Sequence, residues 1–107
     1  MNEFLGETKK IKLKSLLGFA QKSGKAISGE EGILKAIKSN KIKVLLISSN
    51  CSENTRKNYL NQVIYYNIPY NDIVLTKEEI GSSIGKVQRS AVAITDEGFA
   101  KAILNLV

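Results

Sequence analysis

Apolar residues recur at helical spacing in parts of this chain and form short continuous runs in others. Residues 9–23 carry an i, i+3, i+4, i+7 stripe, made by Leu13, Leu16, Leu17 and Ala20. This stripe predicts an amphipathic helix. Residues 44–47, Val-Leu-Leu-Ile, are uniformly apolar, which is typical of a central strand covered on both faces. Residues 1–8 show no periodicity and are expected to be a loose lead-in.

Helix-capping residues and shorter apolar runs predict the remaining elements. These are a strand at 26–28, a helix at 29–40, a helix after Ser52 that stops before Pro69, a strand at 72–75, a short helix from Thr76 to Gly85, a strand at 90–95 and a last helix after Asp96. Helices that alternate with short strands indicate an α/β fold, here a three-layer α/β/α sandwich with a mixed four-stranded sheet. With 107 residues, the chain is expected to form a single domain.

The segment from Lys22 to Lys35 holds the densest group of structural signals. It combines a helix end, a minimal strand and the start of a new helix, where Ser28 and Glu31 have the spacing of a capping box. Gly29 and Gly32 in the first turn weaken that helix by roughly 1 kcal/mol each, a cost expected where another backbone comes close. The start of this helix presents the Glu31 carboxylate, the glycine backbone and the Lys35 ammonium group. Together these groups predict a binding surface.

Neither glycine-lysine pair of the chain has the spacing of a nucleotide-binding phosphate loop. The first run, from Gly18 to Lys25, is one residue too long and is followed by Ala26. The second, from Gly81 to Lys86, is one residue too short. Both are interpreted as helix ends.

Positive charge is concentrated in one third of the chain. The net charge is +6, but residues 9–43 hold ten lysines and two glutamates, a net +8. Such asymmetry favours a polyanionic partner, and we expect Lys22, Lys25 and Lys35 to cluster around the strand-to-helix turn. A solvated lysine-rich surface is the alternative. An anionic membrane is disfavoured because these helices are expected to lack an exposed aromatic wedge.

The residue types needed for catalysis or metal binding are scarce. The chain has no histidine, and its one cysteine, Cys51, has no neighbouring base in the sequence to activate it. No group of acidic residues and cysteine has metal-ligand spacing. The sequence therefore predicts a protein that is not an enzyme and binds no cofactor or metal. Without a signal peptide or a membrane-spanning run, it is expected to be soluble and cytoplasmic.

Several motifs together resemble a known family. They are Leu17-Gly-Phe-Ala-Gln-Lys-Ser-Gly-Lys25, Ser28-Gly-Glu-Glu31 leading to Lys35-Ala-Ile37, Tyr66-Asn-Ile-Pro-Tyr70 and Ile94-Thr-Asp-Glu-Gly-Phe-Ala-Lys101. With these motifs the chain resembles the kink-turn-binding ribosomal proteins, the family of the large-subunit proteins seven-Ae and thirty-e. It looks closest to the bacterial YlxQ-type members.

The resemblance implies a particular RNA site. In the family a glycine, an Asn-Glu pair and a lysine at a helix start contact guanines of a kinked RNA, and the loop before the last strand covers an extruded nucleotide. Gly29 and Lys35 match, whereas Glu31 and Gly32 stand where the family has Asn-Glu. With the charge pattern, this predicts an RNA surface made of Lys22, Lys25, Gly29, Glu30, Glu31, Gly32, Lys35, Ile84, Gly85, Lys86, Val87, Gln88 and Arg89.

The sequence thus predicts a non-catalytic RNA-binding protein of the translation apparatus. Its expected partner is a structured RNA of ribosomal origin. A kinked or internally looped RNA is expected, because proteins recognise RNA mainly through unstacked bases and backbone shape. The protein is expected to be a monomer that associates with the ribosome. The alternative is a protein-interaction or ribosome-assembly module whose RNA site has drifted.

Overall fold

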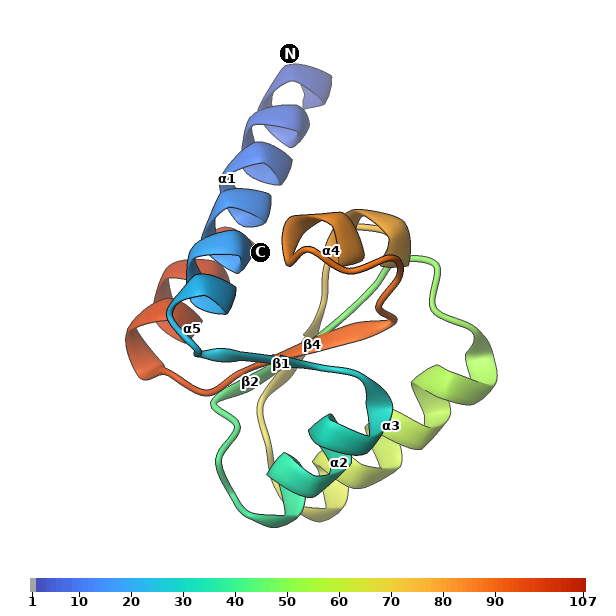
Figure 1. The fold of residues 1–107 in the computed structure, drawn as a ribbon. Coiled ribbons are helices and arrows are strands. Elements are labelled where there is room, and N and C mark those ends of the chain that lie inside the picture. The colour runs from blue at the N-terminus through green and yellow to red at the C-terminus, as the bar shows by residue number, and fades with distance from the viewer. Residues whose placement is uncertain (1) are drawn as a thin grey trace.

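The computed structural model describes residues 2–107, with side chains from Gly6 onward. In this part of the chain, helices and short strands alternate (Figure 1). The elements are α1 (Asn2–Lys22), β1 (Ala26–Ser28), α2 (Glu30–Lys38), β2 (Val44–Ile47), α3 (Glu53–Tyr65), β3 (Tyr70–Asp72), α4 (Lys77–Ser83), β4 (Ala91–Ile94) and α5 (Glu97–Leu104).

The four strands form one mixed sheet in the order β1-β4-β2-β3. The central strand β4 runs antiparallel to both of its neighbours, while β2 and β3 are parallel. All four residues of β2 and all four of β4 are buried, which agrees with strands covered on both faces.

Successive residues of the central strands point into two separate cores. Val44 and Leu46 of β2 pack with apolar residues of α1, α4 and α5. Leu45 and Ile47 pack with residues of α2 and α3 on the other face. The predicted α/β/α sandwich is therefore confirmed, with three helices on one face and two on the other (Figure 1).

The predicted caps of three helices are confirmed. Ser52 Oγ accepts the Thr55 amide at 3.2 Å, and Asp96 Oδ2 accepts the Phe99 amide at 2.9 Å. Thr76 and Glu79 form the expected reciprocal capping box.

Two boundaries were predicted wrongly. Residues 2–8, expected as a loose lead-in, continue α1, and Met1 lies outside the described residues. β3 spans residues 70–72, whereas a strand was predicted at 72–75. Its position is set by pairing with residues 45–47 of β2. Ile73 and Leu75 are nonetheless buried, and this burial explains the apolar pattern that suggested a strand.

No helix within residues 2–107 is long and apolar enough to cross a bilayer.

Glu79 fastens the short helix α4 to α1. Its carboxylate accepts the Thr76 amide at 3.0 Å and lies 3.2 Å from Lys14 Nζ and 3.6 Å from Lys10 Nζ. The Thr76 amide, followed by the charge of Lys14 and Lys10, lowers the pKa of Glu79. This anchoring matters because the chain that follows α4 carries six of the thirteen predicted RNA residues.

We predict that Glu79→Gln lowers the free energy of unfolding by about 1 kcal/mol at pH 7, the usual value of a helix cap. A carboxylate with a lowered folded-state pKa stabilises the fold above its unfolded pKa of about 4.3, and that contribution disappears as pH falls through the folded value. Urea unfolding of both proteins from pH 7 to pH 3 measures the difference, which should shrink below about pH 4. Glu97→Gln is the control, since Glu97 makes only an exposed pair with Lys101.

Candidate functional site

Gly29 makes the sharp turn from β1 into α2. Its φ of +87° lies in the region that favours glycine, and no atom outside the turn lies within 4 Å of a Cβ built there. The glycine is therefore needed for its backbone conformation, and the expected close approach of another backbone at Gly29 is not found. No side chain caps α2. The amides of its first turn, Glu30 to Gly32, have no intrahelical acceptors, as at every helix start, and here no capping side chain accepts from them either.

The predicted capping box between Ser28 and Glu31 is wrong. Ser28 Oγ instead accepts a hydrogen bond from Arg89 Nε at 3.1 Å. The Arg89 amide donates to the Lys77 carbonyl at 3.0 Å, and its Nη1 donates to the Gln88 carbonyl at 2.6 Å. Arg89 thereby joins the end of β1 to the segment that precedes β4.

The segment from Ile84 to Arg89, which we call the 84–89 loop, folds back over α4. A Cβ at Gly81 would lie 2.5 Å from the Val87 carbonyl oxygen, so the loop backbone rests directly on Gly81. The Lys86 amide also donates to the Gly81 carbonyl at 2.7 Å. This contact turns the Val87 side chain outward, where 84% of it is exposed.

Ile84 is the one residue of the 84–89 loop whose predicted role the structure contradicts. Only 5% of it is exposed, and it packs in the core beneath α1 and α4. Its side chain therefore offers no apolar cover to a surface ligand. Gly85 ends α4 with a φ of +75°, and Lys86, Val87 and Gln88 are all exposed.

A hollow of about 240 Å³ lies between the α2 start and the 84–89 loop. It is lined by Gly29, Glu30, Thr55, Tyr59, Gln88, Arg89, Ser90 and Ala91. Burial, and then the nearby charge of Glu30, raises the pKa of Tyr59 to about 12. The phenol therefore stays protonated at neutral pH and keeps a hydrogen to donate.

Asn50, just after β2, holds α4 from the other side. Its Oδ1 accepts the Lys77 amide at 2.8 Å, and its Nδ2 donates to Glu78 Oε1 at 3.0 Å. That amide hydrogen bond is the main cause of the lowered pKa of Glu78. The base of the 84–89 loop is thus fixed to the ends of β1 and β2.

The α2 face beside the hollow carries charge that is free to bind. Glu30, Glu31 and Lys35 are exposed, and none of the three forms an ion pair with another described residue. Gly32 is exposed on the same turn, and a Cβ there would lie 3.3 Å from Ile27 Cγ2. A larger residue at this position would press against β1.

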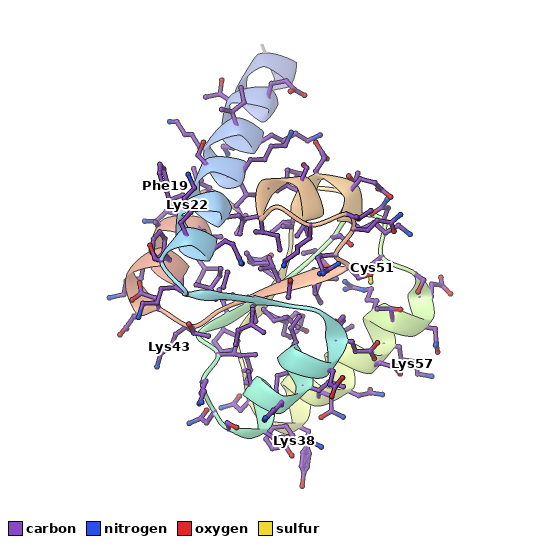
Figure 2. All side chains as sticks on the ribbon, in the orientation of Figure 1. Phe19, Lys22, Lys38, Lys43, Cys51 and Lys57 are labelled. Carbon is purple, nitrogen blue, oxygen red and sulfur yellow. The ribbon has the colours of Figure 1, made fainter. Side chains whose placement is uncertain are left out.

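Lys22 and Lys25 are not part of this group. They precede β1, whereas Gly29 follows it, and an extended chain advances about 13 Å from residue 25 to residue 29. Figure 2 shows Lys22 beside the last turn of α1, at the opposite side of the sheet from Cys51 and α3. The expected cluster of Lys22, Lys25 and Lys35 around one turn is therefore wrong.

Cys51 has no catalytic setting. Burial raises the pKa of its thiol, which disfavours the reactive thiolate. Among the described residues, no group of three or more cysteine, aspartate and glutamate side chains is arranged to hold a metal ion.

The sequence interpretation did not include four of the residues that line the hollow. Thr55 and Tyr59 lie one helical turn apart on α3, Ser90 precedes β4, and Ala91 is the first residue of β4. Nothing local in the sequence shows that α3 borders the start of α2, so no pattern indicated that Thr55 and Tyr59 belong to the site.

Comparisons with known proteins agree with this arrangement. The model of the ribosomal protein L7Ae/L30e/S12e/Gadd45 family matches residues 11–104. The chain is 37% identical over 91 residues to the RNA-binding protein YlxQ of Bacillus subtilis (strain 168), covering 85% of this chain and 90% of that one. It is 34% identical over 103 residues to the protein of the same name from Enterococcus faecium, covering 96% and 98%. A solved structure of a protein of unknown function from Bacillus halodurans has a TM-score of 0.81 at 29% identity, covering 89% and 95%.

We predict that Gly81→Ala destabilises the protein by about 1–3 kcal/mol, because the added methyl group meets the backbone of Val87 and Gln88. Urea unfolding measures the loss. Gly6→Ala is the matched control, since Gly6 is a helical glycine with nothing within 4 Å of its Cβ position. That change should stabilise the helix by up to about 1 kcal/mol. Equal stabilities of the two variants would contradict the proposed close contact.

Proposed function

Because the chain belongs to the L7Ae/L30e/S12e/Gadd45 family of ribosomal proteins, we propose that it is a non-catalytic RNA-binding protein that recognises a kinked or internally looped RNA. The observation that carries this proposal is the 84% exposed Val87, held by the 84–89 loop beside an uncapped helix start and a polar hollow. The proposed partner is a structured cytoplasmic RNA, ribosomal in origin, and the proposed binding unit is a monomer.

The start of α2 supplies groups that read base edges. Lys35 can donate to the O6 and N7 acceptors of guanine, and the Glu31 carboxylate can accept from an exocyclic amino group. The uncapped amides of Glu30 to Gly32 are further donors, and the positive end of the helix dipole favours phosphate there. In a base-paired duplex most base edges are hidden in a deep, narrow groove, so these groups suit bases exposed by a kink.

The 84–89 loop and the hollow supply a place for one unstacked base. Val87 offers an apolar surface, while the Gln88 amide offers hydrogen bonds. Lys86 and Arg89 add positive charge on the same side. A single base covered by apolar and polar contacts is the common mode of sequence-specific RNA recognition outside duplexes.

Protein interaction is the second candidate function. An exposed valine beside polar groups also fits a small protein interface. The two functions differ in salt dependence, because RNA binding releases counterions from phosphates and a small apolar contact does not.

We predict that affinity for a kinked RNA falls steeply with salt and that Lys86→Gln reduces the slope of log affinity against log salt by just under 1, the value of about one phosphate contact. Titrations at several salt concentrations measure the slopes. Lys57→Gln is the control, since Lys57 lies on α3 two residues from Thr55 and so points away from the hollow. Affinity that is independent of salt in the wild-type protein would favour the protein-interaction function.

We further predict that Glu31→Gln and Val87→Asp reduce the preference for a kinked RNA over a plain duplex by roughly 5- to 150-fold, the range of 1–3 kcal/mol for a good base contact. Since Ser28 does not cap α2 through Glu31, the Glu31 change should leave stability nearly unaltered. Parallel titrations with the two RNAs measure the preference, and urea unfolding checks the fold.

The duplex acts as an internal control in this experiment. Glu31→Gln removes one negative charge, so duplex affinity should stay the same or rise slightly while affinity for the kinked RNA falls. If both variants keep the full preference of the wild-type protein, Glu31 and Val87 do not read the RNA.

A further inference from the structure

We propose that the protein has a second RNA surface, at the opposite end of the sheet, that binds an unpaired strand. This second surface consists of Phe19, Lys22, Lys25 and Lys43, and unpaired nucleotides would stack on Phe19 with their phosphates on the lysines. This inference takes from the proposed function only that the partner is RNA.

The sheet register brings the four residues to one place. The Lys25 amide donates to the Ala20 carbonyl at 2.8 Å, so Lys25 lies against the last turn of α1 next to Phe19. The Thr95 amide donates to the Lys25 carbonyl at 2.9 Å, and the Lys43 amide donates to the Ile94 carbonyl at 2.7 Å. Lys25 and Lys43 therefore flank the end of β4 on its two sides, with backbones two strand spacings or roughly 9.5 Å apart.

Phe19 is exposed in a position where a nucleotide base could stack on its ring. It lies two residues after the buried Leu17 but turns away from the core, with 58% of the residue exposed, so the expectation that the lysine-bearing helices lack an exposed aromatic side chain is wrong. Lys22 is three residues further along and lies on the same face of α1. Figure 2 shows Phe19 and Lys22 together, with Lys43 below them on the same side of the molecule. An exposed aromatic ring among cations is the arrangement by which proteins bind single strands without base pairing.

The electrostatics of the second surface favour phosphate. Lys22, Lys25 and Lys43 are exposed, and none of them has an ion-pair partner among the described residues. Two carboxylates lie nearby, Asp96 and Glu97. The first accepts the Phe99 amide as a helix cap, and the second lies 3.8 Å from Lys101 Nζ. Counting these two acids and Lys101 with the three lysines leaves a net charge of +2.

The second surface is separate from the α2 start and the 84–89 loop. Along β4, the chain from Arg89 to Thr95 covers about 20 Å, so one residue cannot serve both surfaces. One RNA could therefore occupy the two surfaces with its kinked part and its unpaired flank, or two RNAs could bind at once.

The test uses the full chain and two probes, a short labelled oligouridine and a kinked RNA hairpin without unpaired ends. We expect the oligouridine to bind in the presence of saturating hairpin. Phe19→Ala should weaken oligouridine binding by about 5- to 150-fold, the range for loss of one aromatic stack, and Phe19→Tyr should restore it. Lys25→Gln and Lys43→Gln should each reduce the salt slope by about 0.7, the value for one phosphate of a single strand.

Two controls separate this inference from the proposed function. Tyr65→Ala removes another aromatic residue, 74% exposed at the end of α3, and should leave oligouridine binding unchanged. Glu31→Gln and Val87→Asp should impair hairpin binding alone. Displacement of the oligouridine by the hairpin, or unchanged binding by Phe19→Ala, would overturn the second surface even if the hairpin preference is found. If the wild-type protein shows no preference for the kinked hairpin over a plain duplex but still binds oligouridine through Phe19, only the kinked-RNA function is overturned.

Discussion

The contact between Gly81 and the backbone of Val87 is the constraint on which the candidate site depends. A Cβ at Gly81 would lie 2.5 Å from the Val87 carbonyl oxygen, so the loop reaches its position only over a glycine. α4 itself has seven residues, too short to be stable alone, and is held by Glu79 toward α1 and by Asn50 toward β2. The exposed position of Val87 thus depends on the polar contacts of Glu79 and Asn50 that hold α4 in place.

Sequence reasoning predicted the parts of this fold that local chemistry decides. Helix starts at Ser52, Thr76 and Asp96 follow from hydrogen bonds between residues three positions apart, and the buried run of β2 follows from composition alone. Two of the failures involve distant partners. Ser28 was expected to cap α2, but it accepts from Arg89, 61 residues away. The register of β3 depends on β2, which no local pattern records.

The same limit explains how the candidate site was partly misread. Counting charge along residues 9–43 treats the lysines as one region, yet β1 carries Lys25 and Gly29 to opposite ends of the sheet. Ile84 has the hydrophobicity expected of a contact residue, but it lies in the core, and Val87 is the apolar residue of the loop that is turned outward. Pairing the α2 start with the 84–89 loop came from family resemblance. The structure supplies its physical cause, since β1 and β4 are neighbours and Ser28 lies opposite Val92.

At the candidate site, the residues that stabilise the fold differ from those proposed to contact RNA. This difference helps to interpret the departures from the family pattern. Gly29, Gly81 and Arg89 hold the backbone in place, whereas Glu31, Lys35 and Val87 are exposed and contribute little to packing. An exposed residue can change with a cost to folding of only a few tenths of a kcal/mol. Glu31 in place of asparagine therefore cannot be attributed to the needs of the fold. A carboxylate accepts hydrogen bonds but cannot donate them, while an amide does both. If position 31 contacts RNA as proposed, its carboxylate would bind only base edges that present a donor, and it would repel phosphate where the amide would tolerate it.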